Sequence, residues 1–321
     1  MIVVTGAAGF IGSCLVSVLN ASGESDIIVV DDFTRPEKEA NLQGKIFLEK
    51  VQRNDFFPWF ELNKQKISFI FHLGARTDTT EFNQTILDEL NIGFSCRIFD
   101  SCAEADIPLI YASSAATYGD GHLGYDDDHH LSETLHPLNL YGESKNEIDK
   151  YVLKSSKQPP FWAGMKFFNV FGPNEYHKGR MASVVIHAFR QIKNTGELRL
   201  FGSTSPDFKD GEQLRDFIYV KDVTDVLMYF YRNRPNSAIY NLGTGEARSF
   251  NDLGKAVFNA MKLPVNIQYI PMPSDLLNKY QNYTRANITK LRQTGYSREF
   301  HSLEKAIEDY IGNYLEYGRF L

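Results

Sequence analysis

MIVVTGAAGFIG, residues 1–12, is the stretch of sequence that decides the fold. An apolar run, Ile2–Val4, leads directly into three glycines, Gly6, Gly9 and Gly12, and then into a segment with helical spacing. Glycines placed in this way let the backbone turn tightly, approach a pyrophosphate and pack a helix against a strand. The free N–H groups at the start of that helix favour bound phosphate. The stretch therefore predicts the strand, turn and helix that begin a dinucleotide-binding fold.

Short apolar runs alternate with helix-like segments through the first half of the chain. The runs predicted to be buried strands are Ile2–Val4, Ile27–Val30, Ile67–Leu73 and Pro108–Ala112, and the helix-like segments between them include Gly12–Ser22 and Asp88–Ala105. Alternation of this kind is typical of an α/β protein with a Rossmann-type, doubly wound parallel sheet. In such a sheet the binding site lies at the carboxyl ends of the strands.

The regular alternation ends after about Val170, where Pro, Gly and aromatic residues become frequent. Helical spacing returns at Ala182–Lys193, Asp222–Tyr231 and Phe250–Met261. We therefore expect an NAD(P)-binding Rossmann domain over residues 1–170, rejoined by residues 215–245. Residues 171–214 and 246–321 are expected to form a smaller α/β substrate-binding lobe.

The composition of the 321 residues is that of an ordinary globular protein, with 43% hydrophobic and 23% charged residues. A formal net charge of −6 argues against a nucleic-acid-binding surface. No apolar stretch approaches the roughly 20 residues needed to cross a bilayer. We expect a cytoplasmic protein with no membrane and no nucleic-acid partner.

Neither the cysteines nor the acidic run Asp126–His130 predicts a metal site. The three cysteines, Cys14, Cys96 and Cys102, lack the paired spacing of metal ligands and leave an odd thiol. The run Asp-Asp-Asp-His-His at 126–130 shows no ligand spacing on a regular element, so we interpret it as a solvated loop. No metal is expected.

Two adjacent carboxylates, Asp31 and Asp32, end the second predicted strand, about 20 residues beyond the glycine loop. A carboxylate in this place accepts a hydrogen bond from a ribose 2′-hydroxyl and favours NAD. Arg35, Lys38 and Arg53 follow closely and are able to meet a 2′-phosphate instead. Residue chemistry alone leaves NAD and NADP open.

A second motif, Tyr141-Gly-Glu-Ser-Lys145, places a phenol and an ammonium on one helical face. We expect the charge of Lys145 to lower the pKa of Tyr141 and so to prepare it for proton transfer. Ser113 and Ser114 follow the strand Pro108–Ala112 and are expected at the carboxyl edge of the sheet, where one hydroxyl can bond the reacting oxygen.

These motifs, in this order, resemble the extended short-chain dehydrogenase/reductase family. Within it, three stretches look like the ADP-L-glycero-D-manno-heptose 6-epimerases: residues 111–119 (YASSAATYG), residues 168–184 with Phe168–Pro173, His177–Gly179 and Met181–Val184, and Arg215–Val220. The similarity continues through 240–245 (YNLGTG) and Tyr280-Gln281. Of these, HKG with MAS is the sharpest pointer to the heptose enzymes.

The resemblance implies roles for particular residues. The cofactor would be held by the glycine loop with Phe10 and Ile11, by Asp31, Asp32, Lys38 and Arg53, by Leu73, Gly74, Ala75, Arg76, Thr77 and Asn91, and by Tyr141, Lys145, Val170 and Lys178. The sugar nucleotide would meet Ser114, Asn169, Lys178, Arg180, His187, Phe201, Gly202, Ser203, Thr204, Arg215 and Tyr280. Tyr141, Lys178, Lys145 and Ser114 would be catalytic. The family's preference for NADP tips the choice of cofactor, and family membership suggests a homo-oligomer, with a pentamer as its form.

Three departures from the family pattern affect the pocket. Arg76 replaces a small residue, Arg180 stands where a serine is usual, and a longer acidic insert, Ser205–Leu214, precedes Arg215. The implied activity is inversion of C6″ of an ADP-heptose for the inner core of lipopolysaccharide, by transient oxidation with bound NADP. The alternatives are a UDP-sugar 4-epimerase and a non-catalytic NADP-sensing regulator. A 4,6-dehydratase is disfavoured because Ala115-Ala116-Thr117 occupies the place of its Asp-Glu pair.

Overall fold

The computed structural model describes residues 1–79, 81–273 and 281–321. Their largest element is a seven-stranded sheet in which every pairing is parallel. In spatial order its strands are β11 (Ala238–Leu242), β6 (Trp162–Phe167), β5 (Leu109–Ser114), β4 (Phe69–His72), β1 (Ile2–Thr5), β2 (Ile27–Asp31) and β3 (Glu49–Gln52). The order reverses next to β1, as in a doubly wound sheet. The predicted Rossmann-type fold is confirmed.

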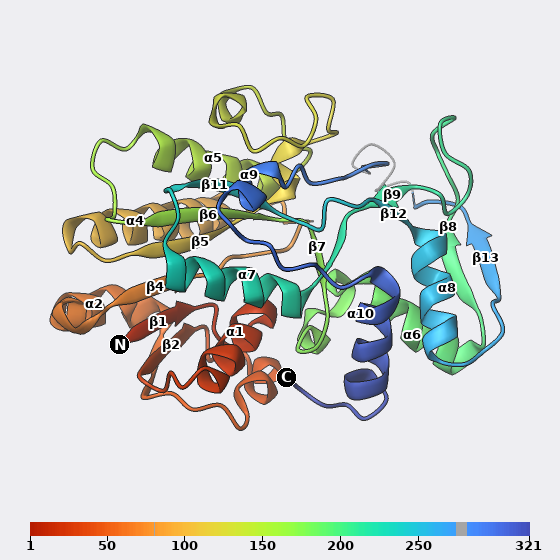
Figure 1. Cartoon of the computed structure of the whole chain (residues 1–321), viewed down its shortest axis with the longest axis horizontal. Coiled ribbons are helices and arrows are strands. Elements are labelled where there is room, and N and C mark those ends of the chain that lie inside the picture. Colours follow the sequence, from red (N-terminus) through yellow and green to blue (C-terminus); the bar gives the residue numbers. More distant parts are fainter. Residues whose placement is uncertain (80, 274–280) are drawn as a thin grey trace.

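Helices cover both faces of the sheet (Figure 1). On one face α1 (Phe10–Ala21) packs against α7 (Val220–Asn233), and both contribute to a core with the side chains of β1, β4 and β6. The other face is covered by α2 (Phe56–Asn63), α4 (Phe94–Glu104) and α5 (Leu140–Lys154), whose buried side chains form a second core. A short helix, α3 (Gln84–Leu87), precedes α4 through a π-helical turn over Asp88–Gly93.

The remaining elements form a lobe beside the carboxyl ends of the sheet, at the right of Figure 1. It contains α6 (Val184–Thr195), α8 (Phe250–Ala260) and α10 (Leu303–Tyr310), with the parallel pair β8 (Leu198–Phe201) and β13 (Ile267–Ile270). Its own hydrophobic core is formed mainly by α6, α8, α10 and β8. Two further pairs are β7 (Asn169–Phe171) with β10 (Phe217–Tyr219), and β9 (Leu214–Arg215) with β12 (Arg248–Ser249). Helix α9 (Thr289–Gln293) lies next to β11.

Segment 215–245 returns to the first half of the molecule, where it supplies β11 to the sheet edge and α7 to the α1 face. The domain boundaries at residues 170, 214 and 245 stay a prediction. Three strands of the sheet were not predicted, β3, β6 and β11. Strand β3 has one buried residue, Val51, and β6 contains a glycine and a lysine, so neither reads as an apolar run.

The interpretation of residues 126–130 as a solvated loop was wrong for Asp127. This side chain is 4% exposed, accepts a hydrogen bond from the backbone N–H of Asn241 at 2.7 Å and pairs with Lys290 at 3.4 Å. His129 accepts a hydrogen bond from Ile239 N–H. The run therefore covers the outer edge of β11, because its acceptors satisfy donors of that edge strand. In the described residues no cluster of three or more His, Cys, Asp or Glu is arranged to hold a metal ion.

Among the helices that the structure describes, none has the length and apolarity needed to span a membrane.

Candidate dinucleotide and catalytic site

A cavity of about 540 Å³ opens at the carboxyl ends of β1, β2 and β4. Most residues predicted to hold the dinucleotide line it, namely Gly6, Gly9, Phe10, Ile11, Gly12, Asp31, Asp32, Lys38, Arg53, Leu73, Gly74, Ala75, Arg76, Thr77 and Lys178. Asn91, Tyr141, Lys145 and Val170 are not on its wall. The crevice lies where the strand order reverses, which is where this fold binds dinucleotides.

The glycine loop is shaped as a cradle that side chains would fill. Gly6 has a φ of 67°, and a Cβ there would lie 2.7 Å from the backbone of Gly74. A Cβ on Gly12 would lie 2.1 Å from the carbonyl oxygen of Gly6. Helix α1 begins at Phe10, with Gly9 as its N-cap, so Gly12 lies in its first turn. The tight turn and the free N–H groups of α1 fit the pyrophosphate of a dinucleotide.

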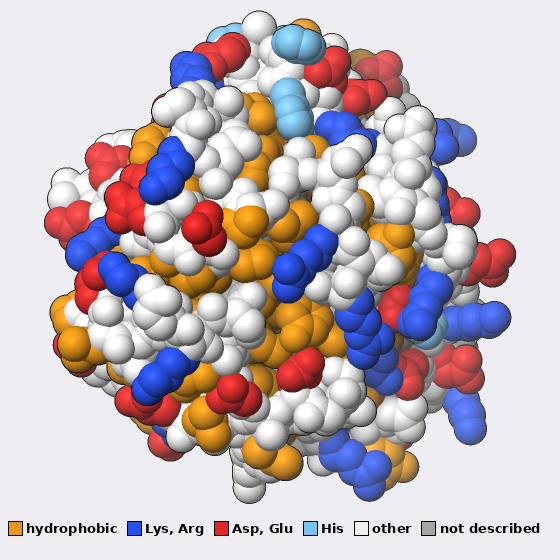
Figure 2. All heavy atoms as spheres, turned by 60° about the vertical axis from the view of Figure 1, so that its left-hand side comes forward, with side chains coloured by type: hydrophobic (Ala, Val, Ile, Leu, Met, Phe, Trp, Pro, Cys, Tyr) orange, Lys and Arg blue, Asp and Glu red, His pale blue; other side chains and the backbone are white. Residues whose placement is uncertain are grey.

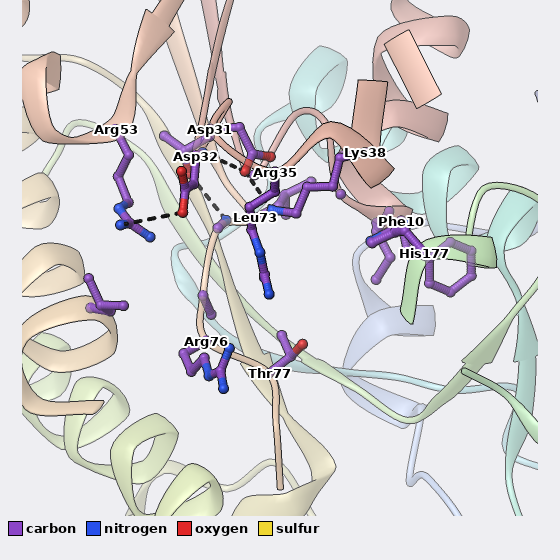
Figure 3. A pocket seen from close by; sticks show the side chains of 18 of the residues that line it. Phe10, Asp31, Asp32, Arg35, Lys38, Arg53, Leu73, Arg76, Thr77 and His177 are labelled. Carbon is purple, nitrogen blue, oxygen red and sulfur yellow. Dashed lines mark hydrogen bonds and ion pairs between the residues drawn. The ribbon is translucent and has the colours of Figure 1, made fainter. Parts of the chain in front are cut away.

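At one end of the cavity two carboxylates are surrounded by cations (Figure 3). Asp31 accepts hydrogen bonds from Ala8 N–H and from Lys38 Nζ, both at 2.8 Å. Asp32 accepts from the Thr34 hydroxyl at 2.6 Å and lies 3.9 Å from Arg53. The hydrogen bond from Thr34 is the main cause that lowers the pKa of Asp32, and the charge of Arg53 acts in the same direction. This end presents both acceptors for a ribose and cations for a phosphate.

The loop after β4 forms the opposite wall, where Figure 3 shows Arg76 and Thr77. The guanidinium of Arg76 pairs with Glu81 at 3.0 Å. Asn91 is fully buried and bonds both backbone groups of Arg76, accepting from N–H at 2.8 Å and donating to C=O at 3.1 Å. It also donates to Ser144 at 2.9 Å, so Asn91 shapes the wall from behind and links it to α5.

The phenol, amine and hydroxyl of the predicted catalytic group come together at the junction of α5 and β5. Ser114 shares a hydrogen bond with the side chain of Tyr141, and Lys145 donates to the carbonyl oxygen of Ala112 at 2.9 Å. Burial raises the pKa of Tyr141, while the bond with Ser114 opposes the rise. Burial also lowers the pKa of Lys145 to about 8, against the attraction of Asp149.

The expected lowering of the Tyr141 pKa is not the net result in this structure, because burial raises it. The phenol is enclosed, and the ammonium is directed to the carbonyl of Ala112. Desolvation disfavours the phenolate, so the tyrosine is held in its neutral, proton-donating form.

Lys178 reaches the cavity from a 3₁₀ segment, Tyr176–Met181, in the second lobe. Its ammonium lies 5.5 Å from the ring centroid of Phe10. Burial lowers the pKa of Lys178, and the buried carboxylate of Glu175 opposes this. Glu175 accepts hydrogen bonds from Gly172 N–H at 3.2 Å and from the Ser183 hydroxyl at 2.7 Å, and so closes the loop that presents Lys178.

The neighbouring His177 connects this loop to the end of the cavity that contains Asp31 and Lys38. Its Nδ1 lies 3.2 Å from the side-chain nitrogen of Asn41, which also donates to the carbonyls of Ala8 and Asn174. Burial lowers the pKa of His177 to about 4, and the charges of Lys38 and Lys178 act in the same direction. The imidazole is therefore neutral here, and it links the segment that contains Asn41 to the 176–181 segment.

The residues predicted to face the sugar are spread over the second lobe and its border. Asn169 is exposed at the start of β7, and Arg215 is buried, donating to the carbonyl oxygens of Leu214 and Gln281. Phe201, Gly202 and Ser203 are partly buried at the end of β8, Thr204 and Arg180 are exposed, and His187 lies on α6. Tyr280 lies outside the described residues.

Arg35, predicted as a possible partner of a 2′-phosphate, also lines the cavity. The lining residues that the sequence interpretation left out are Thr5, Val30, Glu37, Asp78, Leu90, Phe94, His177 and Met181. Thr5 and Val30 stand at strand ends, so the predicted topology was a signal for them. Leu90, Phe94 and Met181 are apolar residues brought in by tertiary packing, and the local sequence around them carries no such signal.

Comparison with known proteins agrees with this geometry. Residues 2–243 match the NAD dependent epimerase/dehydratase family. The chain is 46% identical to an ADP-L-glycero-D-manno-heptose-6-epimerase of Fusobacterium nucleatum and 43% identical to one of Nitratidesulfovibrio vulgaris, over 98% of both chains in each case. The crystal structure of the Helicobacter pylori enzyme of the same name is 27% identical, with a TM-score of 0.80, over 97% of this chain and 95% of that one. MoeE5 in complex with UDP-glucuronic acid and NAD is 26% identical, with a TM-score of 0.77, over 97% of both chains.

Proposed function

This chain belongs to the NAD dependent epimerase/dehydratase family, and on that premise we propose that it inverts C6″ of ADP-D-glycero-D-manno-heptose to give ADP-L-glycero-D-manno-heptose. The observation that carries the proposal is the 43–46% identity to heptose epimerases over nearly the whole length, including the second lobe. That lobe holds His177 and Lys178 in the wall of the dinucleotide cavity.

The reaction needs a route through a planar carbon, because C6″ of the sugar carries no acidic proton. A nicotinamide dinucleotide held by the glycine loop would supply reversible transfer of a hydride at such a carbon. The residues of this chain bind and turn the sugar and move the proton of its hydroxyl group. When the C6″–H and O–H bonds break, the hydride would go to the dinucleotide and the proton to one side chain. Reduction would return the hydride to the opposite face of the carbon while a second side chain protonates the oxygen. The first side chain then releases its proton to solvent and the second takes one up, so the net change is the configuration alone.

Two proton-transferring side chains are proposed, Tyr141 and Lys178. One accepts the hydroxyl proton during oxidation of C6″. The ketone then turns so that its other face meets the cofactor, which moves its oxygen to a new position. The second side chain supplies a proton there. The two side chains come from different elements, α5 and the 176–181 segment. The scheme requires this, because the oxygen occupies a different position in each of the two proton transfers. Ser114 bonds the reacting oxygen beside Tyr141.

For the cofactor we propose NADP, with NAD as the alternative. Arg35, Lys38 and Arg53 surround the end of the cavity where a 2′-phosphate would lie. Asp31 and Asp32 support NAD instead, because they accept a 2′-hydroxyl bond. Calorimetric titration of the cofactor-free protein with NADP⁺ and NAD⁺ tests this choice. We expect Arg53→Ala to weaken the binding of NADP⁺ much more than the binding of NAD⁺.

The deciding experiment follows the C6″ proton by NMR during incubation with ADP-D-glycero-D-manno-heptose, beside UDP-glucose under the same conditions. We expect conversion of the heptose without net consumption of NADP. Conversion of the UDP sugar alone would support the UDP-sugar 4-epimerase and overturn the specific assignment. Binding of the dinucleotide without turnover of either sugar would support the non-catalytic regulator.

We also propose that the protein assembles as a homo-oligomer in the cytoplasm, with a pentamer as the form implied by the family. On the face shown in Figure 2 hydrophobic side chains gather in the middle and charged side chains surround them, which suits contact with a second surface. Light scattering coupled to gel filtration tests the assembly, and a monomeric mass would contradict it.

A further inference from the structure

Beneath the catalytic residues lies a pair of buried opposite charges, Asp149 on α5 and Lys166 on β6. Asp149 is 0% exposed and Lys166 2% exposed, and their charged atoms are 3.2 Å apart. Placing two charges in a protein interior is costly, and a pair of this kind often adds little net stability. Apolar side chains could pack in this place without that cost. The presence of an ion pair next to Lys145 therefore indicates a role beyond stabilising the fold.

Asp149 takes part in a ladder of contacts between α5 and β5. Tyr141 meets Ser114, Lys145 donates to the carbonyl of Ala112, and Asp149 accepts from Ser113 at 2.7 Å and from Tyr111 at 3.0 Å. The three side chains of α5 are spaced four residues apart and so lie on one helical face. Each step of the ladder fixes the register of α5 against β5, and Asp149 is its lowest step.

Lys166 completes the environment from the next strand. It donates to Thr117 at 2.7 Å, and its ammonium lies 4.6 Å from the ring centroid of Tyr118. Its charge therefore partly balances Asp149 and limits how strongly that carboxylate attracts Lys145.

We propose that Asp149 and Lys166 are positioning residues for the reaction: together they hold Tyr141 in register with Ser114 and keep the ammonium of Lys145 charged. The inference deepens the proposed function and rests on it, because it requires Tyr141 to transfer a proton and a charged Lys145 to oppose the effect of burial on the phenol. Asp149 stabilises the ammonium, and Lys166 moderates that effect.

The other titratable groups near Lys145 cannot replace Asp149 as the negative charge that stabilises its ammonium. Lys145 interacts with Asp149 on its own helix, where Tyr141 lies one turn before it, and with His72 on β4. Tyr111 on β5 and Lys166 on β6 contact Asp149. Burial raises the pKa of Tyr111 well above its ordinary value and lowers the pKa of His72 to about 3, so both are neutral near pH 8. Asp127 and Lys290 act on Lys166 and through it on the pair.

The test measures the alkaline limb of the pH dependence of kcat, where activity falls as Lys145 loses its proton. Asp149→Asn removes the attracting charge, so we expect this limb to move down by about one pH unit or more, equivalent to about a tenfold change in the ratio of charged to neutral lysine at a given pH. Lys166→Met removes the balancing charge, so we expect the limb to move up. KM for the sugar nucleotide should change little in either variant.

A second readout does not depend on turnover. In holoenzyme with ¹³C-labelled lysine, the Cε signal of Lys145, assigned by its loss in Lys145→Met, should titrate at lower pH in Asp149→Asn and at higher pH in Lys166→Met. Asp309→Asn and Lys221→Met are matched controls, because they break an ion pair of 2.6 Å between α7 and α10. We expect neither control to move the signal or the limb.

The double variant Asp149→Asn with Lys166→Met removes both charges and so leaves no uncompensated ion. We expect it to fold better than either single variant, with a titration near that of the wild type. Singles that shift in the same direction, singles that lower the melting temperature without any shift, or a double variant that fails to fold would overturn the inference. Absence of epimerase activity in the wild type, with the opposite shifts of the Lys145 signal intact, would instead remove the proposed function alone.

Discussion

Burial favours the neutral form of both Tyr141 and Lys178, because it raises the pKa of the phenol and lowers the pKa of the amine. In each case a polar neighbour opposes the effect, Ser114 for Tyr141 and Glu175 for Lys178. If both transfer protons, Tyr141→Phe and Lys178→Met should each lower kcat by about 10²–10⁴-fold, the usual value of a positioned acid or base. The initial rate of C6″ inversion, followed by NMR, measures this loss.

Lys157→Met is the control for the lysine variant, because Lys157 is exposed and outside the cavity. It should epimerise at the wild-type rate. A Lys178→Met protein that also works at the wild-type rate would exclude the scheme with two proton-transferring residues.

Gly12 is a residue whose missing side chain matters. Gly12→Ala would push a methyl group to 2.1 Å from the carbonyl oxygen of Gly6, so the glycine loop must shift. We expect a loss of about 1–3 kcal/mol in stability, typical of overpacking, and weaker binding of dinucleotide by calorimetry. Gly312→Ala is the matched control, because a Cβ there meets nothing within 4 Å. Equal dinucleotide affinity in the two variants would disprove the close approach.

His72 makes the stability depend on pH. It is 2% exposed at the end of β4, bonded to Thr5 at 2.7 Å and Ser95 at 2.8 Å, and burial lowers its pKa to about 3. Below about pH 6.5 the imidazole binds a proton in the unfolded chain but not in the native state. The free energy of unfolding therefore decreases as the pH falls from about 6.5 towards 3, by at most about 5 kcal/mol. Urea unfolding across this range should show a shallower pH dependence for His72→Gln. The exposed His136→Gln should behave as wild type, and a wild-type slope in His72→Gln would contradict the assignment.

At the scale of elements, one carboxylate fastens three segments. Asp216, between β9 and β10, accepts hydrogen bonds from Thr244 N–H and its hydroxyl, both at 2.7 Å, from Gly245 N–H at 2.9 Å and from Ala286 N–H at 3.0 Å. Asp216→Asn places an amide among these donors and should cost about 2–4 kcal/mol, because buried donors lose their partner. Denaturant unfolding and faster amide exchange at Gly245 and Ala286 would show it. The exposed Asp207→Asn should cost less than about 0.5 kcal/mol.

The elements also show how far sequence reasoning reaches. The apolar runs ending at Val4, Val30, Leu73 and Ala112 predicted four strands of the sheet, because parallel strands are buried on both faces. Strand β6 escaped notice because Lys166 interrupts its apolar pattern, and that same lysine is satisfied by Asp149, from another element. Likewise the motif at 141–145 predicted which residues meet. It did not predict that Lys145 points to Ala112, because that contact depends on tertiary geometry.

At the scale of the whole molecule, residues distant in sequence share one core. Leu227 of α7 is fully buried with residues of β1 and α1, although more than half the chain separates it from them. Leu227→Ala should therefore cost about 2–5 kcal/mol and lower a single unfolding transition seen by both circular dichroism and tryptophan fluorescence. Leu62→Ala, at a position 84% exposed, is the control and should leave the transition in place. A variant in which only part of the signal shifts would show that the two lobes unfold separately.

The bond between Asn41 and His177 has a consequence for how the protein is occupied in the cell. It joins the segment beside the end of the crevice that contains Asp31 and Lys38 to the segment that presents Lys178, so a dinucleotide would be gripped from two sides at once. Escape would then require the two walls to part, whereas the sugar nucleotide comes and goes with each turnover. We expect the dinucleotide to be a long-term resident that serves many substrate molecules, and to remain with the protein through purification.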